Sequence, residues 1–279
     1  MGDVVPPLQH ANITSLTARY LQLADEALPG RIEGLYIVGS VALGDYQAGR
    51  SDIDFVTVLR SELSSEELAA VERVHRLLGI PIPKPWFDGI YVTWEDLTRN
   101  PQEITVAPHT HEGRFERSRG FEANPSVWIT LGHHSHAIRG PAPPAVWHDV
   151  DVVRSWNVGN LNSYWRGLVK RGRQFIPHIG DHIVEQAVVW CVPGVSRMHY
   201  TIATGDTISK ADACRYALAM FPERWHTLIG EAQALQAGER PSRRPARSRQ
   251  HELADFMEFV INDANAVVPV EGASGGIQP

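Results

Sequence analysis

The sequence predicts an α+β protein, with a mixed sheet and helices in the first half of the chain and an all-helical bundle in the second. Apolar, strand-like runs alternate with helical patterns up to the proline-rich run at 141–144. From about residue 148 onward the strand signals fade and only helical spacing remains. Because a run of prolines favours a linker, we expect two domains, at residues 1–145 and 146–267.

The elements of the first domain follow from apolar spacing and from turn residues. In chain order they are a helix at 14–28, strands at 31–38 and 52–59, a helix at 65–78 and a strand-like run at 86–92. The inner face of the second helix is expected to hold Leu68, Val71, Val74 and Leu77. Three prolines, Pro81, Pro83 and Pro85, predict a rigid connector before the last strand. Residues 100–127 are rich in polar and turn residues and are expected to be irregular, with a short element at 128–139.

The second domain shows helical patterns throughout. We expect helices at 149–172, 181–204, 208–219, 222–237 and 250–266. The basic stretch at 240–249 contains two prolines, which disfavour a regular helix, so it is expected to be a solvated loop. The tail at 268–279 is expected to be disordered.

Composition excludes several classes of protein. The 32 acidic and 26 basic residues argue against a general nucleic-acid binder, which would usually be basic. Cys191 and Cys214 lie in apolar, helix-like sequence and are interpreted as free thiols of a reducing compartment. The first ten residues lack the basic start and apolar core expected of a signal peptide, and no apolar stretch approaches the length of about 20 residues that spans a bilayer. We expect a cytoplasmic monomer without membrane or stable nucleic-acid partners.

Residues 39–54, GSVALGDYQAGRSDID, carry the clearest chemical signal. Asp52 and Asp54 are two apart on an expected strand, so both carboxylates project from one face. Like charges this close repel, and a divalent cation removes that repulsion because carboxylate and phosphate oxygens are usual ligands of Mg²⁺. The alternative is a surface hairpin with two solvated aspartates. The Gly39-Ser40 turn one strand earlier favours the magnesium site, since glycine allows close approach of a phosphate and a helix start can face an anion.

Gly39-Ser40, a ten-residue connection and then Ser51-Asp52-Ile53-Asp54 resemble the signature of the DNA polymerase β-like nucleotidyltransferase superfamily. The resemblance implies a third carboxylate on a neighbouring strand. The best candidate is Asp88, within the strand-like run at 86–92, and the alternative is a turn residue before Gly89.

Two later segments, at 196–205 and 209–213, resemble the C-terminal helical domain of the aminoglycoside (3'')(9) adenylyltransferases, which modify streptomycin and spectinomycin. This resemblance implies that Arg197 and Lys210 contact a triphosphate, whereas a lone Arg or Lys on a helix is usually solvated. The chain departs from the family pattern at Gln236, where an aromatic residue is expected near the nucleotide.

The acidic residues that bind the cationic drug in that family correspond by simple count to Ile183 and Ala187, which carry no charge. Asp181 and Glu185 lie two positions earlier with the same spacing of four and can share one helix face. They are either the displaced drug ligands or an exposed acidic pair at a helix start, where the helix dipole favours negative charge.

Together the two resemblances imply transfer of AMP from Mg-ATP to a hydroxyl of a small-molecule acceptor, foremost an aminoglycoside-type antibiotic. The phosphates are expected along Gly39, Ser40 and Ser51, with one or two Mg²⁺ ions held by Asp52, Asp54 and Asp88. Asp88 is the expected proton acceptor, and the site is expected in a cleft between the domains. The alternatives are the same transfer to another small molecule or a protein hydroxyl, and a nucleotide sensor without turnover.

Overall fold

The computed structural model describes residues 10–78, 85–174, 180–239 and 244–267. It divides the chain into two compact units, Met1–His148 and Asp149–Pro279, where we expected a boundary after residue 145. Unit 1 contains the sheet and unit 2 is helical in its described residues, which confirms the predicted α+β class. The tail at 268–279, Pro81 and Pro83 lie outside the described residues.

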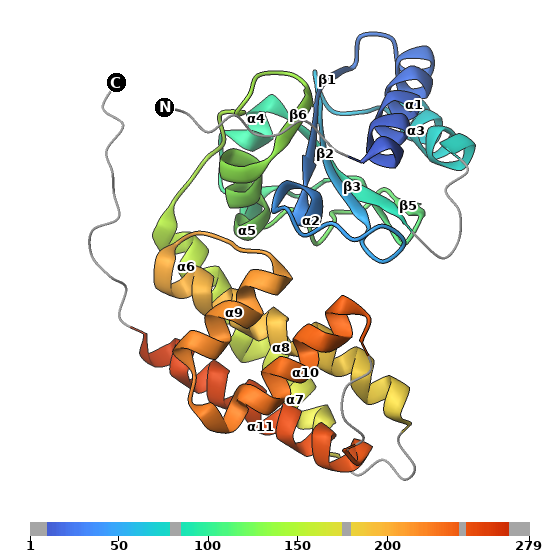
Figure 1. Cartoon of the computed structure of the whole chain (residues 1–279). Helices are drawn as coiled ribbons and strands as arrows, with labels where there is room; N and C mark the ends of the chain where they lie inside the picture. The colour runs from blue at the N-terminus through green and yellow to red at the C-terminus, as the bar shows by residue number, and fades with distance from the viewer. Residues whose placement is uncertain (1–9, 79–84, 175–179, 240–243, 268–279) are drawn as a thin grey trace, which may run out of the picture. The chain divides into compact units, whose positions relative to one another are not determined.

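Unit 1 is built on one mixed sheet with strand order β5-β4-β3-β2-β1-β6 (Figure 1). Its strands are β1 (Ile32–Val38), β2 (Ile53–Leu59), β3 (Phe87–Thr93), β4 (His109–His111), β5 (Arg114–Glu116) and β6 (His136–Arg139). Only the β2–β3 pair is parallel among the pairings in the described residues, and α3 (Ser65–Leu78) connects these two strands. A parallel pair needs such a crossover connection, whereas the antiparallel pairs do not.

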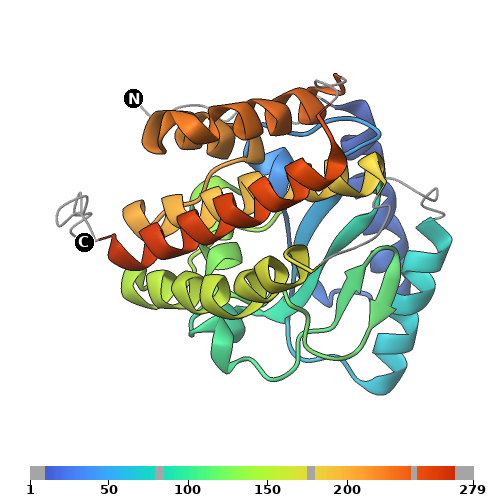
Figure 2. The same cartoon turned by 90° about the horizontal axis from the view of Figure 1, so that it is seen from below.

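Helices cover both faces of this sheet. α1 (Ala11–Ala27) and α3 pack side by side on one face (Figures 1 and 2). The other face carries α4 (Trp94–Leu97), α5 (Pro125–Ile129) and a π-helical turn at Thr130–His134. Side chains of successive strand residues alternate between the two cores: Leu35 and Ile37 belong to the cluster under α1 and α3, and Tyr36 and Val38 to the opposite one. This is the period of two that a strand imposes.

Three local expectations for unit 1 are wrong. The stretch at 100–127 is not irregular throughout, because it contains a turn of 3-10 helix at Pro101–Glu103 and the β4–β5 hairpin. Strands of three residues are too short to show alternation in the sequence. The element at 128–139 is split between α5, the π-helical turn and the edge strand β6. In α3 the inner face holds Ala70, Val71 and Val74, while Leu77 is 64% exposed.

A chain of buried polar groups crosses the core under α1 and α3. Tyr20 donates to the Tyr91 hydroxyl (2.9 Å), which lies 2.7 Å from His75 Nε2. The Thr57 hydroxyl lies 3.0 Å from the Tyr20 hydroxyl. With the Tyr20 proton directed at Tyr91, Thr57 donates to Tyr20. Burial favours the neutral imidazole of His75, whose Nε2 accepts from or donates to the Tyr91 hydroxyl according to its tautomer.

We predict that this histidine makes unit 1 acid-sensitive. Burial lowers the pKa of His75 from its ordinary value of 6.5 to about 3, so protons bind the unfolded chain more tightly. The stabilisation is fully present above pH 6.5 and is lost as the pH falls toward 3. At pH 5 the loss is about 2 kcal/mol of unfolding free energy relative to pH 7. Denaturant unfolding at pH 5 and pH 7 should show this loss of unfolding free energy in the wild-type protein. The loss should be smaller in His75→Gln, because glutamine can accept a hydrogen bond but does not titrate. An equal loss in both proteins would contradict the assignment.

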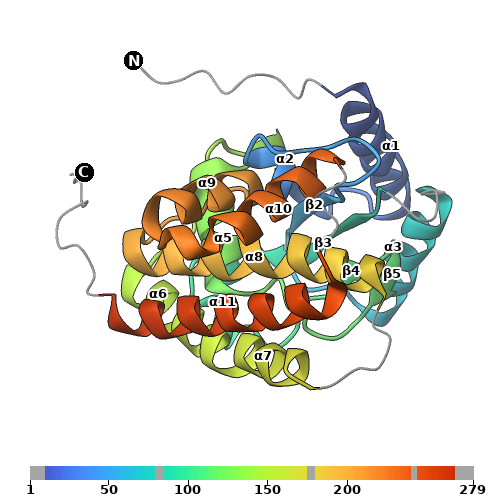
Figure 3. The same cartoon turned by 60° about the horizontal axis from the view of Figure 1, so that its bottom comes forward.

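Unit 2 is a bundle arranged around the long helix α8 (Asp181–Thr204). In chain order its elements are α6 (Val150–Asn160), a π-helical turn at Leu161–Trp165, α7 (Arg166–Gly172), α8, α9 (Lys210–Met220), a 3-10 turn at Glu223–Trp225, α10 (His226–Ala237) and α11 (Ala246–Ala266). α6, α9, α10 and α11 all pack against α8 (Figure 3). All five helices expected in this half of the chain are therefore present among its described residues. The first contains a π-helical turn, and the last begins four residues earlier than expected, at Ala246.

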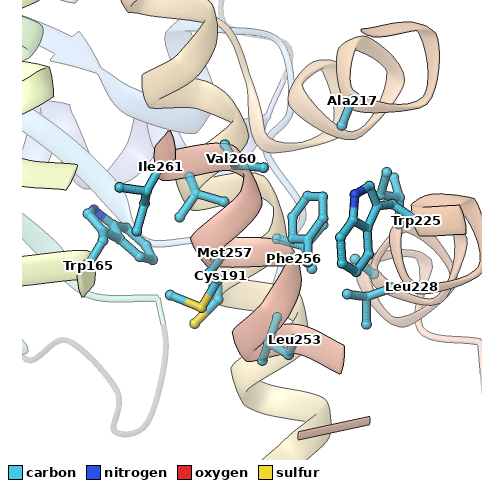
Figure 4. Packing of buried hydrophobic residues seen from close by; sticks show 14 of the residues in the cluster. Trp165, Cys191, Ala217, Trp225, Leu228, Leu253, Phe256, Met257, Val260 and Ile261 are labelled. Carbon is cyan, nitrogen blue, oxygen red and sulfur yellow. The ribbon is translucent and has the colours of Figure 1, made fainter. Parts of the chain in front are cut away.

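The core of unit 2 is formed by large side chains from several helices. In Figure 4, Trp165 and Ile261 lie on one side of α11 and Phe256 and Trp225 on the other. Both cysteines are buried free thiols, as expected from the sequence. Among the described residues, no helix is both long and apolar enough to cross a membrane.

Candidate active site

Two parallel strands bring the acidic residues of unit 1 together. The register of β2 and β3 places Asp54 opposite Asp88, although these residues are 34 positions apart in the chain. Both therefore project from the same face of the sheet. Asp52 precedes β2 by one residue, and its Oδ1 accepts the N–H of Trp86 at 3.2 Å. The neighbouring-strand position that the superfamily resemblance implied for a third carboxylate is thus the position of Asp88.

Asp88 is held by a hairpin turn. Its side chain is 8% exposed, and its two oxygens accept the N–H groups of Glu112 (2.8 Å, to Oδ2) and Gly113 (3.3 Å, to Oδ1). Burial raises the pKa of Asp88 above its usual range, and the charge of Asp52 adds to this rise. The two N–H donors and His111 oppose it, because they favour the ionised carboxylate.

These three carboxylates suit a magnesium ion. Mg²⁺ prefers hard oxygen ligands, and protein sites usually supply one or two carboxylates with the rest from phosphate and water. The negative charge of Asp52 raises the pKa of Asp88, and a bound cation would offset this repulsion. Their oxygens are of the type that binds Mg²⁺, but in the described part of the chain these three side chains do not place one oxygen each within 4.8 Å of one another.

Gly39 occupies a position that other residues cannot take. It begins the short helix α2 (Gly39–Ala42) with a φ of +61°, a conformation that L side chains rarely adopt. A Cβ atom there would stand 1.9 Å from Oδ2 of Asp54. The glycine therefore allows the Asp54 carboxylate to lie against the backbone. Ser40 follows on α2, and the Ser51 hydroxyl accepts the N–H of Gln47 at 3.0 Å, which closes the loop before β2.

Arg197 and Lys210 both belong to unit 2. Arg197 is partly buried on α8, and Lys210 is the exposed first residue of α9. Gly205, with φ +79°, ends α8 between them. The Ser209 hydroxyl accepts the N–H of Asp212 at 3.0 Å and caps α9. The motif at 196–213 thus forms a helix–turn–helix corner that carries both cations.

The acidic pair at the start of α8 is engaged within the protein. Arg249 contacts Asp181 (Nη2 to Oδ1, 2.6 Å) and Glu185 (Nη1 to Oε1, 3.9 Å). It also contacts the buried Glu231 on α10 at 2.7 Å. Asp181 and Glu185 do share one side of α8, but both contact the guanidinium of the buried Arg249. Ile183, the position obtained by simple count, is 60% exposed.

We expected residues 240–249 to form a solvated loop, and this expectation is wrong for residues 244–249, which the structure describes. Arg249 is 2% exposed, and Arg244 contacts Glu231 at 2.9 Å and also Glu252 at 2.5 Å. Pro245 does not exclude the helix, because it precedes the first helical residue, where its missing N–H is not needed. Residues 240–243 lie outside the described residues.

Sequence patterns did not reveal the hairpin turn that binds Asp88. The local signal was weak, since Glu112-Gly113 is not one of the Asn-Gly or Asp-Gly pairs that mark such turns.

Two family models match the chain, one in each unit. The model described as a nucleotidyltransferase domain matches residues 21–86. The model described as aminoglycoside adenylyltransferase, C-terminal domain, matches residues 161–263.

Similar proteins span nearly the whole chain. The spectinomycin 9-adenylyltransferase of Campylobacter jejuni is 22% identical over 264 residues, covering 89% of this chain and 90% of that protein. Among solved structures, the spectinomycin adenyltransferase AAD(9) from Enterococcus faecialis, with ATP and spectinomycin, superimposes with a TM-score of 0.67 at 13% identity. That match covers 89% of this chain and 99% of the other. The likeness confirms the fold.

Proposed function

We propose that this chain, whose two units match the models of a nucleotidyltransferase domain and of the aminoglycoside adenylyltransferase C-terminal domain, transfers AMP from Mg-ATP to a hydroxyl of spectinomycin or a similar aminocyclitol. The observation that carries this proposal is the register that sets Asp88 beside Asp54, with Asp52 adjoining them. A nucleotide sensor without turnover would have no use for a third, buried carboxylate beside the two at the start of β2.

The chemistry assigned to the side chains is an in-line transfer. The acceptor oxygen forms a bond to the α-phosphorus as the bond to pyrophosphate breaks. Asp88 is too weak a base to deprotonate an alcohol in advance, so it accepts the hydroxyl proton as the new bond forms. Asp52, Asp54 and Asp88 would hold one or two Mg²⁺ ions, which would supply charge stabilisation to the attacking and leaving oxygens.

The remaining candidate residues are assigned to the phosphates. Gly39 and Ser40 offer backbone N–H groups at the start of α2, and Ser51 closes the adjoining loop. In unit 2, Arg197 and Lys210 are assigned as phosphate ligands, because guanidinium and ammonium groups bind phosphate oxygens by charge-assisted hydrogen bonds.

The contacts of Arg249 favour an acceptor with few positive charges. A polycationic drug needs carboxylates to replace its hydration, but Asp181 and Glu185 are already paired with Arg249. We therefore place spectinomycin ahead of the more highly charged streptomycin. The same observation favours, as a second candidate, adenylyl transfer to a different and less charged hydroxyl compound.

The test is pyrophosphate release from Mg-ATP with spectinomycin, with streptomycin and without acceptor. We expect release that depends on spectinomycin and disappears when Mg²⁺ is chelated. ATP binding without release in the presence of either drug would overturn the aminocyclitol assignment, and a panel of neutral hydroxyl compounds would then test the second candidate.

We predict that Arg197→Ala raises the KM for ATP about tenfold, which corresponds to the loss of one charge-assisted contact of roughly 1.4 kcal/mol. Steady-state kinetics at saturating acceptor measure this change. Arg171→Ala, at an exposed position of α7, is the matched control and should leave the KM unchanged. An unaltered KM in both variants would remove Arg197 from the nucleotide site.

A further inference from the structure

The turn between β4 and β5 has an unusual backbone. His111 pairs with Arg114, so the hairpin loop consists of Glu112 and Gly113 alone. Their φ angles are +49° and +73°, the two positive values that a type I′ turn requires. Glycine adopts this conformation freely, but a residue with a Cβ pays about 1–2 kcal/mol for it. Within the described parts of the chain, Glu112 is the one residue other than glycine with positive φ.

This backbone directs both turn N–H groups at a single carboxylate. Glu112 N lies 2.8 Å from Asp88 Oδ2 and Gly113 N lies 3.3 Å from Asp88 Oδ1, so each oxygen accepts one hydrogen bond. An ionised carboxylate has about four lone-pair positions. The two N–H groups of the turn occupy one lone-pair position on each oxygen of Asp88. The second position on each oxygen remains for another hydrogen-bond partner or a metal ion.

The strand that leads into the turn holds the backbone on either side of Asp88. The Thr110 hydroxyl donates to the carbonyl of Phe87 at 3.1 Å and accepts the N–H of Gly89 at 3.2 Å. Residues 110–113 therefore contact β3 before, at and after Asp88. These contacts oppose an electrostatic force on Asp88. If its carboxylate were free to rotate, it would turn away from the like charges of Asp52 and Asp54.

We propose that the β4–β5 hairpin is a positioning device for Asp88, in which the left-handed Glu112-Gly113 turn orients the carboxylate toward the reacting hydroxyl. The inference rests on the proposed adenylyl transfer for its kinetic consequence. Glu112 acts through its backbone N–H and its φ, and its side-chain carboxylate has no part in the device. Glu112 and Gly113 are positioning residues, and Asp88 is the group that meets the substrate.

A matched pair of substitutions separates backbone from side chain. Glu112→Asn and Glu112→Val both remove the carboxylate, but asparagine tolerates the left-handed conformation and valine opposes it. We expect Glu112→Val to lower kcat about 10-fold to 100-fold, the effect of a misplaced catalytic group, with the KM for ATP unchanged. Glu112→Asn should retain most of the wild-type kcat. Equal losses of kcat in both variants would show that the Glu112 side chain is responsible. An unchanged kcat in both would show that the turn does not affect catalysis. Either result would overturn the proposal.

Two further measurements test the coupling between the turn and Asp88. In an Asp88→Asn background, Glu112→Val should lower kcat much less than in wild type, since residues that act through one group are not additive. Independently of activity, hydrogen exchange should show the amides of Glu112 and Gly113 protected in the wild-type protein and exposed in Asp88→Ala. Unchanged protection in Asp88→Ala would overturn the positioning role. Absence of turnover with every acceptor would refute the proposed function alone, because the exchange experiment needs no substrate.

Discussion

Asp88→Asn is expected to lower kcat for adenylyl transfer by about 10²–10⁴-fold, the usual contribution of a positioned general base. Asparagine has nearly the same shape and can still accept a hydrogen bond from the Glu112 N–H, but it cannot take up a proton. ATP binding should persist, because Asp52 and Asp54 remain. Pyrophosphate release measures the first effect and calorimetric titration with Mg-ATP the second.

Asp96→Asn is the matched control for this substitution. Asp96 is also a buried aspartate of unit 1, but its carboxylate caps α4 through the N–H and hydroxyl of Thr93. Its replacement should reduce stability and leave kcat nearly unchanged. If Asp88→Asn instead weakens Mg-ATP binding as much as it weakens turnover, Asp88 is chiefly a metal ligand and another group accepts the proton.

Arg249→Met is expected to destabilise the protein by about 3 kcal/mol, near the lower end of the range for breaking a buried ion pair. Arg249 and Glu231 are 2% and 5% exposed, and the guanidinium joins the start of α8 to α10 and α11. Methionine fills similar volume but leaves the Glu231 carboxylate with Arg244 as its remaining cation. Urea unfolding followed by circular dichroism measures the change.

Two comparisons test the cause of that loss. Arg173→Met removes a half-exposed arginine that contacts Asp255 and Glu258 on the outside of α11, and such surface pairs contribute at most about 1 kcal/mol. Adding Glu231→Gln to Arg249→Met should recover part of the stability, because it removes the buried charge that was left without its partner. A loss in Arg249→Met no larger than in Arg173→Met would show that the cluster adds nothing beyond surface pairing.

The parts of the fold that could be predicted depend on local spacing. The helix at 65–78 carries its own start signal and apolar periodicity, and the structure has it at Ser65–Leu78. The strands around Asp52 and Asp54 are marked by apolar runs on both sides of a Gly-Ser turn. The hairpin at 109–116 and the edge strand β6 could not be predicted, because strands of three or four residues are stabilised by the partner they pair with and show no period of their own.

The α+β class, the helical second half and the residue types of the candidate site can be predicted from the chain, because each depends on residues close together in the sequence. Contacts between distant groups become known only from the folded structure. Asp88 is 24 residues from the Glu112 N–H that holds it, and Asp181 is 68 residues from Arg249. Such contacts arise from strand register and helix packing, which depend on the whole core. They therefore produce no periodic pattern in the sequence around either contacting residue. The orientation of Asp88 and the pairing of Asp181 and Glu185 are therefore properties of the folded chain.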